Sequence, residues 1–138
     1  MIMEEKLFLL DIVTPLKIIF SDKVESVSVP GALGGFQVLV GHAPLLSSLV
    51  IGEIKVTDKN GNTDRYATTG GFLEVRNNKV ILLAETAEKA SEIDVKRAEA
   101  AQNRARERLH VRQPDTDLVR AEAALQRALN RLRIAGRN

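Results

Sequence analysis

Apolar and polar residues alternate in short runs through the first 84 residues of the chain. Val24-Glu25-Ser26-Val27-Ser28-Val29 places Val27 and Val29 on one face, which is the pattern of a half-buried β-strand. Further apolar runs lie at 7–13, 36–40, 54–57, 65–69, 72–75 and 80–83, and Gly, Pro and Asn residues separate them. About eight to ten short strands at this spacing predict a β-sandwich or a small barrel.

Two asparagine-containing turns join neighbouring runs. Asn60-Gly61 predicts a hairpin, because both residues tolerate the positive φ that a type I′ turn requires. Asn77-Asn78 lies between the runs 72–75 and 80–83 and predicts a second hairpin.

Near residue 87 the pattern changes from alternation to a recurrence every three or four residues. One predicted helical stripe consists of Ile93, Arg97, Ala98, Ala101, Ala105 and Leu109. A second consists of Leu118, Ala121, Leu125, Ala128, Leu129, Leu132 and Ala135. Pro114 interrupts them, because a proline inside a helix removes a hydrogen bond. Asp115, Thr116 and Asp117 are candidate N-caps for the helix that follows.

These patterns predict a fold of two domains: a mainly β sandwich or barrel over 1–86 and an α-helical hairpin, a two-helix arm, over 87–138. Within the arm we expect a helix over about 91–110, a loop over about 111–116 and a helix over about 117–135. A short loop between two such helices favours an antiparallel hairpin. An alanine-rich seam buries little apolar area at ~25 cal/mol per Å², so we expect the arm to be able to open.

Composition narrows the classes of function. Cysteine is absent, which excludes disulfides, thiolate metal sites and thiol nucleophiles. The first residues carry no cationic segment ahead of a cleavable apolar run, and no stretch approaches the ~20 apolar residues of a membrane-spanning helix. We therefore expect a soluble or peripheral protein with no direct membrane insertion. The early acidic residues, without an Arg- and Ser-rich transit segment, favour a bacterial origin.

The formal charge of +2 conceals a gradient along the chain. Residues 1–84 carry a net charge of −1, residues 85–138 carry +3, and the part from Arg104 onward carries +5. A basic helical tip indicates an acidic partner: nucleic acid, anionic lipid, a nucleotide or an acidic protein surface.

No catalytic constellation is apparent in the sequence. The two histidines, His42 and His110, fall in different predicted domains, and neither has a second metal ligand at helical or hairpin spacing. There is no Walker-type phosphate loop and no nucleophile elbow. We therefore predict no catalytic residue and no metal-binding residue, and the chain is not expected to be an enzyme.

The arm carries a more informative pattern of arginines. Arg97, Arg104 and Arg108 follow one side of the first predicted helix, and Arg127 and Arg131 lie four residues apart on the second. They form either a solvated face, balanced by nearby glutamates, or an anion site. In the second case a closed hairpin brings guanidinium forks from both helices onto one polyphosphate. A carboxylate such as that of Glu88 or Asp94 can then accept a hydrogen bond from a base or a ribose.

Several segments occur in an order typical of one protein family. They are Thr14-Pro15, Val27-Ser28-Val29-Pro30-Gly31, Val38-Leu39-Val40-Gly41-His42-Ala43-Pro44-Leu45-Leu46, Gly70-Gly71-Phe72-Leu73-Glu74-Val75 and Ile93-Asp94-Val95-Lys96-Arg97-Ala98. With these segments the chain resembles the epsilon subunits of F-type ATP synthases over nearly its whole length. It departs from them at Gly35, Gln37 and Val40, where the family often has an acidic residue, glycine and proline.

The resemblance implies a non-catalytic rotor subunit. Its β-domain would lie at the foot of the central stalk, against the gamma subunit and the ring of c subunits, and help couple proton flow to ATP synthesis. Its arm would permit turnover when folded and block ATP hydrolysis when extended into the alpha/beta catalytic head. The implied location is peripheral, on the cytoplasmic side of the bacterial cell membrane.

The last of those segments resembles the family's nucleotide motif, and the resemblance implies a regulatory ATP site. Aligned on the motif, its residues are Glu88, Asp94, Arg97, Ala98, Arg104, Arg127 and Arg131. Mg²⁺ can accompany the nucleotide. The alternative is a β-barrel with a basic coiled coil that binds nucleic acid or anionic lipid. Against nucleic acid, the arm lacks aromatic residues for base stacking.

Overall fold

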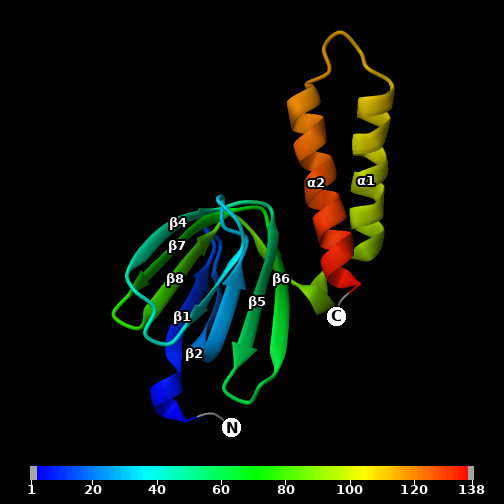
Figure 1. Ribbon diagram of the computed structural model, residues 1–138. Helices are drawn as coiled ribbons and strands as arrows, with labels where there is room; N and C mark the ends of the chain where they lie inside the picture. The colour runs from blue at the N-terminus through cyan, green and yellow to red at the C-terminus, as the bar shows by residue number, and fades with distance from the viewer. Residues whose placement is uncertain (1–2, 137–138) are drawn as a thin grey trace. The chain divides into compact units, whose positions relative to one another are not determined.

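The computed structural model describes residues 3–136 and divides into two compact units, with the boundary between Lys89 and Ala90 (Figure 1). Residues 1, 2, 137 and 138, which the predicted domains include, lie outside the described residues. The first unit begins with a 3-10 turn, η1 (Glu4–Lys6), and is otherwise built of strands. The second holds a 3-10 turn, η2 (Ala90–Glu92), and two helices, α1 (Val95–His110) and α2 (Leu118–Ala135).

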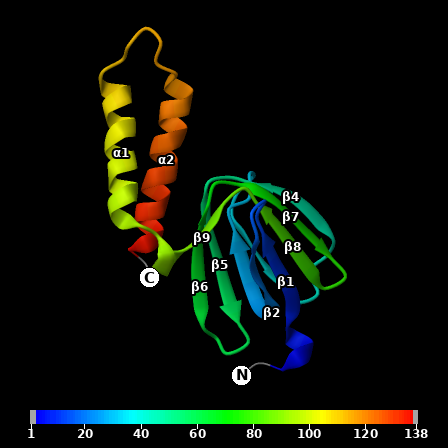
Figure 2. The ribbon, with the colours of Figure 1, turned by 180° about the vertical axis from the view of Figure 1, so that it is seen from behind.

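The first unit is a β-sandwich, as predicted, made from one continuous sheet that curls on itself (Figures 1 and 2). The strand order is β4-β7-β8-β1-β2-β5-β6-β9, and β3 pairs with β2. β1 and β8 are parallel, and the other pairs are antiparallel. The strands are β1 (Phe8–Val13), β2 (Ile18–Val29), β3 (Phe36–Leu39), β4 (Leu45–Leu49), β5 (Gly52–Asp58), β6 (Thr63–Thr68), β7 (Gly71–Arg76), β8 (Lys79–Ala84) and β9 (Ala87–Lys89).

Alternate residues of these strands point into one apolar core. Leu10 and Ile12 in β1 are completely buried, as are Leu73 and Leu82, which lie opposite each other in β7 and β8. Val27 in β2 is also fully buried, which confirms the face predicted for that strand. The branched and aliphatic residues that alternate along the sequence therefore form the interior of the sandwich.

The two predicted hairpins form, but the turn type predicted at Asn60-Gly61 is wrong. Gly61 has a φ of +81°, whereas Asn60 is not among the residues with positive φ. The Asp58 carboxylate accepts the Asn60 backbone N–H at 2.8 Å, and the Asp58 carbonyl accepts the Gly61 N–H at 3.0 Å. Asn77 and Asn78, with φ of 50° and 60°, supply the two positive values that a type I′ turn requires.

The arm begins later than predicted. Residues 87–89 form β9, which pairs with β6, so the first unit extends past the predicted boundary at residue 86. Helix α1 begins at Val95 rather than near 91, because the extended backbone of Asp94 and its side chain cap the helix. Asp117 likewise caps α2, so that helix begins at Leu118, one residue after the predicted start.

Candidate anion site on the helical hairpin

Helices α1 and α2 run antiparallel and pack side by side along their length (Figures 1 and 2). Each begins at an aspartate whose side chain replaces a missing helical hydrogen bond. Asp94 accepts the Arg97 N–H at 3.1 Å, and Asp117 accepts the Arg120 N–H at 3.0 Å. The side chain of Thr116 accepts the Gln113 N–H and so folds the connecting loop instead of capping α2. Capping therefore fixes where both helices start and which residues face each other.

The seam between the helices consists largely of alanines. Ala98 and Ala105 are the buried residues of α1, and α2 buries Ala121, Ala128, Asn130 and Ile134. The sequence correctly predicts the four buried alanines but also places Arg97 and Leu118 in the seam, which is wrong because both side chains are exposed. It misses Asn130 and Ile134, and the Asn130 side chain accepts a hydrogen bond from Arg133 at 2.7 Å.

Most of the predicted phosphate-binding arginines are open to solvent. The side chains of Arg97, Arg104 and Arg127 are exposed, and Arg131 is half-buried. Within residues 3–136, the first three form no side-chain hydrogen bond and no ion pair. Their guanidinium groups therefore keep all their donors available to an anion.

The hairpin places arginines of the two helices at matching heights. Arg97 lies thirteen residues before the end of α1 at His110, and Arg131 lies thirteen residues after the start of α2 at Leu118. Since both helices rise by ~1.5 Å per residue, the two arginines lie at about the same distance from the loop. A closed hairpin therefore presents guanidinium groups from both helices at one level.

The seven predicted ligands do not all lie in one unit. Asp94, Arg97, Ala98, Arg104, Arg127 and Arg131 belong to the hairpin. Glu88 belongs to β9 of the sandwich, opposite Ala67 in β6, and is half-buried. Ala98 is fully buried, so its side chain packs between the helices and is not accessible to a ligand in solvent.

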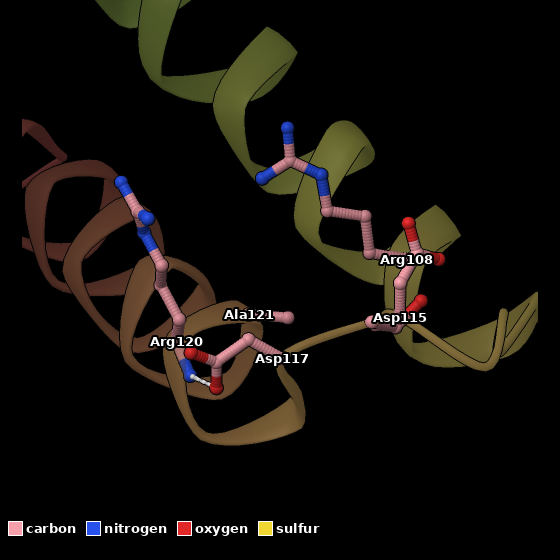
Figure 3. A pocket seen from close by; sticks show the side chains of 6 residues that line it. Arg108, Asp115, Asp117, Arg120 and Ala121 are labelled. Atoms are coloured by element: carbon pink, nitrogen blue, oxygen red, sulfur yellow. Dashed lines mark hydrogen bonds between the residues drawn. The ribbon is translucent and has the colours of Figure 1, made fainter.

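A cavity lies at the loop end of the hairpin (Figure 3). Its volume is about 410 Å³, and it is lined by Arg108, Asp115, Thr116, Asp117, Arg120 and Ala121. The sequence-based prediction of the anion site does not include Arg120. A comparison of the two helices with each other would have found it, because Asp117 and Arg120 repeat the spacing of Asp94 and Arg97.

Across residues 3–136, no three His, Asp or Glu side chains gather closely enough to hold a metal ion. No helix in that part of the chain is long and apolar enough to cross a membrane.

The sandwich carries an exposed apolar face. Phe72 in β7 lies opposite Leu83 in β8, and Leu83 lies beside Val13 in β1. Phe72 is 55% exposed and Leu83 is 54% exposed, and Leu46 in the neighbouring strand β4 is 72% exposed. Large apolar side chains side by side on one face of a sheet indicate a surface that binds another protein. We call Leu46, Phe72 and Leu83 the apolar face.

Two sequence profiles of known families match the chain. The profile for "ATP synthase, Delta/Epsilon chain, beta-sandwich domain" matches residues 7–90, and that for "ATP synthase, Delta/Epsilon chain, long alpha-helix domain" matches residues 91–136. The ATP synthase epsilon chain of Pelotomaculum thermopropionicum is 51% identical over 107 residues, which cover 78% of this chain and 79% of that one. The epsilon chain of Geotalea daltonii is 47% identical over 113 residues, 82% of this chain and 80% of that one.

A solved structure shares the fold. A chain of the Euglena gracilis mitochondrial ATP synthase superimposes with a TM-score of 0.82 over 100% of this chain and 85% of that one, at 21% sequence identity. At that identity the likeness shows the fold alone. The two profiles together span residues 7–136, and the sequence relatives are about half identical. The chain therefore belongs to the epsilon-chain family of ATP synthases.

Proposed function

We propose that this chain is a non-catalytic subunit of the central stalk, which docks through its sandwich on the gamma subunit and the c-ring. It would thereby help couple proton flow to ATP synthesis. Membership of the epsilon-chain family supports the proposal, and the apolar face of the sandwich supplies a surface for the contact. The subunit would lie peripherally, on the cytoplasmic side of a bacterial cell membrane.

The docking proposal is tested by reconstitution with gamma and the c-ring. Phe72→Ser and Leu83→Ser remove apolar area from exposed positions, so the sandwich core is untouched while the docking surface is weakened. Leu16→Ser is the matched control, because Leu16 is 93% exposed and lies outside the apolar face. Binding that is equal for all three variants and the wild type would contradict this docking surface.

The hairpin would act as an ATP-sensitive regulator of ATP hydrolysis. The observation that supports this most is the set of arginines on two facing helices, with Arg97 and Arg131 at one level. Arg97, Arg104 and Arg127 are exposed and form no ion pair among the described residues. Only the closed hairpin presents both helices to one ligand. Since a ligand shifts an equilibrium by its differential affinity for the two states, ATP would stabilise the closed hairpin.

The proposed ligands differ in what they offer the nucleotide. Arg97, Arg104, Arg127 and Arg131 would bind phosphate oxygens through their guanidinium forks. Asp94 already caps α1 with one carboxylate oxygen, which leaves the other to accept a hydrogen bond from the ligand. Glu88 would act as a further acceptor, for the base or the ribose. Mg²⁺ can enter with the phosphates as part of the nucleotide complex.

In the extended state the arm would reach the alpha/beta catalytic head and inhibit hydrolysis. The same arginines would then meet acidic residues of the head, so one basic surface would serve both states. Replacement of Arg127 and Arg131 by alanine should therefore weaken ATP binding and also reduce inhibition of ATP hydrolysis in the assembled synthase. Full inhibition by the doubly substituted protein would argue against the shared role.

The nucleotide site is tested by calorimetric titration of the chain with ATP. Arg127→Ala should abolish saturable binding at this site, or weaken it by ~tenfold or more, because a charge-assisted hydrogen bond is lost. Arg106→Ala is the control, since Arg106 is also an exposed arginine of the hairpin but does not belong to the proposed set. An absence of heat at millimolar ATP would remove the nucleotide site and leave the family membership intact.

A further inference from the structure

The two helices of the hairpin repeat one sequence pattern. Residues 94–101 read Asp-Val-Lys-Arg-Ala-Glu-Ala-Ala, and residues 117–124 read Asp-Leu-Val-Arg-Ala-Glu-Ala-Ala. The correspondence, at a constant offset of 23 positions, continues through Arg104-Ala105 with Arg127-Ala128 and through Arg108-Leu109 with Arg131-Leu132. Each helix therefore carries the same series of arginines.

The structure preserves this repeat. Both aspartates cap their helices through the backbone N–H three residues later. The buried alanines correspond as well: Ala98 with Ala121, and Ala105 with Ala128. The hairpin is therefore close to symmetric under exchange of its two helices, and a feature at one end has a counterpart at the other.

Exchange of the helices maps the proposed nucleotide site onto the loop end. Arg97 and Arg131 correspond to Arg120 and Arg108, respectively. Arg108 lies two residues before the end of α1, and Arg120 lies two residues after the start of α2. The second arginine pair is thus also level across the hairpin, as the first pair is.

The cavity of about 410 Å³ occupies this second position (Figure 3). Four of its six lining residues, Arg108, Asp117, Arg120 and Ala121, correspond to the proposed nucleotide ligands Arg131, Asp94, Arg97 and Ala98. Its volume falls within the range of ~300–1,000 Å³ that is usual for small-molecule sites. The cavity is a feature of the three-dimensional structure and not of the sequence repeat, so it is independent support for the correspondence.

The charges in the cavity leave its guanidinium groups available. In the described part of the chain, Arg108 and Arg120 form no ion pair and no side-chain hydrogen bond. The Asp117 carboxylate accepts the Arg120 backbone N–H, and Asp115 contributes the other negative charge of the lining. Figure 3 shows the two guanidinium groups extending from the two helices, clear of both carboxylates and away from the connecting loop.

We propose that the loop end of the hairpin is a second anion site, which binds the phosphate chain of a nucleoside triphosphate between Arg108 and Arg120. The ligand class rests on the proposed function, because it is taken from the first set of arginines. Position 111, which corresponds to Glu88, is a valine, so the second site lacks a counterpart of the acceptor proposed for the base or the ribose at Glu88. It should therefore bind ATP, GTP and inorganic triphosphate alike.

The second site should be the weaker one. Two aspartates share its lining with two arginines, whereas the first set brings four arginines against Glu88 and Asp94. Because long-range attraction follows the summed charge, the first site should fill at a lower ligand concentration. Occupancy of the second would join α1 to α2 beside the loop and add to the preference for the closed hairpin.

The test is a titration of the full chain with inorganic triphosphate, followed by NMR of its alanine methyl groups. The Ala121 methyl lines the loop-end cavity, and Ala98 is its counterpart in the first set. We expect a saturable shift of the Ala121 methyl resonance that Arg120→Ala weakens ~tenfold or more and that Arg106→Ala leaves unchanged. Arg120 and Arg106 are both exposed on helices, so neither substitution should prevent folding.

The two sites are separated by a second titration, in Arg97→Ala/Arg131→Ala protein. A shift of Ala121 that persists there supports an independent loop-end site, even if Ala98 reports no binding and the proposed nucleotide site fails. No shift of Ala121 in the wild type at millimolar triphosphate would overturn the second site, whatever Ala98 shows. A shift of Ala121 that disappears in the doubly substituted protein would also overturn it, because the signal would then come from the first site.

Discussion

The alanine seam of the hairpin allows its stability to be changed without contact with any proposed ligand. Ala105 is 2% exposed between α1 and α2, whereas Ala100 on the same helix is exposed. Leucine at position 105 adds three carbon atoms where two helix backbones already approach closely. Overpacking of this kind costs about 1–3 kcal/mol. Leucine at position 100 makes the same chemical change in solvent, and its helix propensity is close to that of alanine.

This free-energy cost should shift the equilibrium between the closed and the open hairpin toward the open form. A change of about 1–3 kcal/mol raises the open population roughly 5- to 150-fold. The two helices have 16 and 18 residues, and most of the stability of a helix in a protein comes from its packing contacts. An open hairpin therefore frays, and its backbone amides exchange with solvent.

Hydrogen exchange read by mass spectrometry measures this opening directly. Ala105→Leu should lower the protection of α1 and α2 by the factor above and leave the strands of the sandwich unchanged, because the sandwich is a separate compact unit. Ala100→Leu should leave both unchanged. If Ala105→Leu keeps wild-type protection, or if both variants lose protection equally, then packing at the seam does not control closure and the reasoning fails.

Three further predictions concern stability. Gly71→Ala should destabilise the sandwich to urea more than Gly34→Ala does. Both glycines have φ above +120°, a backbone conformation that costs an alanine about 1–3 kcal/mol. Of the two positions, only Gly71 would also bring the new Cβ against a backbone atom, the Leu83 carbonyl oxygen at 2.0 Å. Leu82→Ala should cost about 2–5 kcal/mol of unfolding free energy, and Leu83→Ala far less, because Leu82 is fully buried and Leu83 is 54% exposed. Asp117→Ala should cost α2 about 1 kcal/mol in thermal unfolding followed by circular dichroism, and Asp117→Asn less, because asparagine also caps helices well.

Much of the sandwich can be predicted from local sequence, because its core residues alternate with polar ones. The failures occur where distant partners decide the structure. Ala87–Lys89 has no alternating apolar pattern, and it is a strand because β6 supplies its hydrogen bonds. The turn at Asn60-Gly61 is determined by Asp58, whose carboxylate binds the Asn60 backbone N–H. A dipeptide rule for turns cannot include that contact.

The candidate site, too, can be predicted from the sequence only in part. The residue types and the helical spacing of the arginines can be found in the sequence, since a helix fixes its own periodicity. Their pairing across the hairpin cannot, because it depends on where each helix starts, and the caps Asp94 and Asp117 determine that. The internal repeat was the missing signal: once residues 94–101 are aligned with 117–124, the loop-end arginines become visible.

The contrast between the two units supports the proposal that the arm responds to an anion. In the sandwich, some cations have acidic partners, as Arg65 has in Glu53 at 3.7 Å and Lys89 has in Asp64 at 3.8 Å. In the hairpin, Arg97, Arg104 and Arg127 have none among the described residues, and the seam beneath them is mostly alanine. Like charges on facing helices oppose closure of the hairpin. The thin apolar seam favours closure, but it buries little area and so offsets only a small part of that repulsion. An anion bound between the helices, as proposed, would remove the repulsion and add hydrogen bonds in the closed state alone, so it would favour closure in two ways.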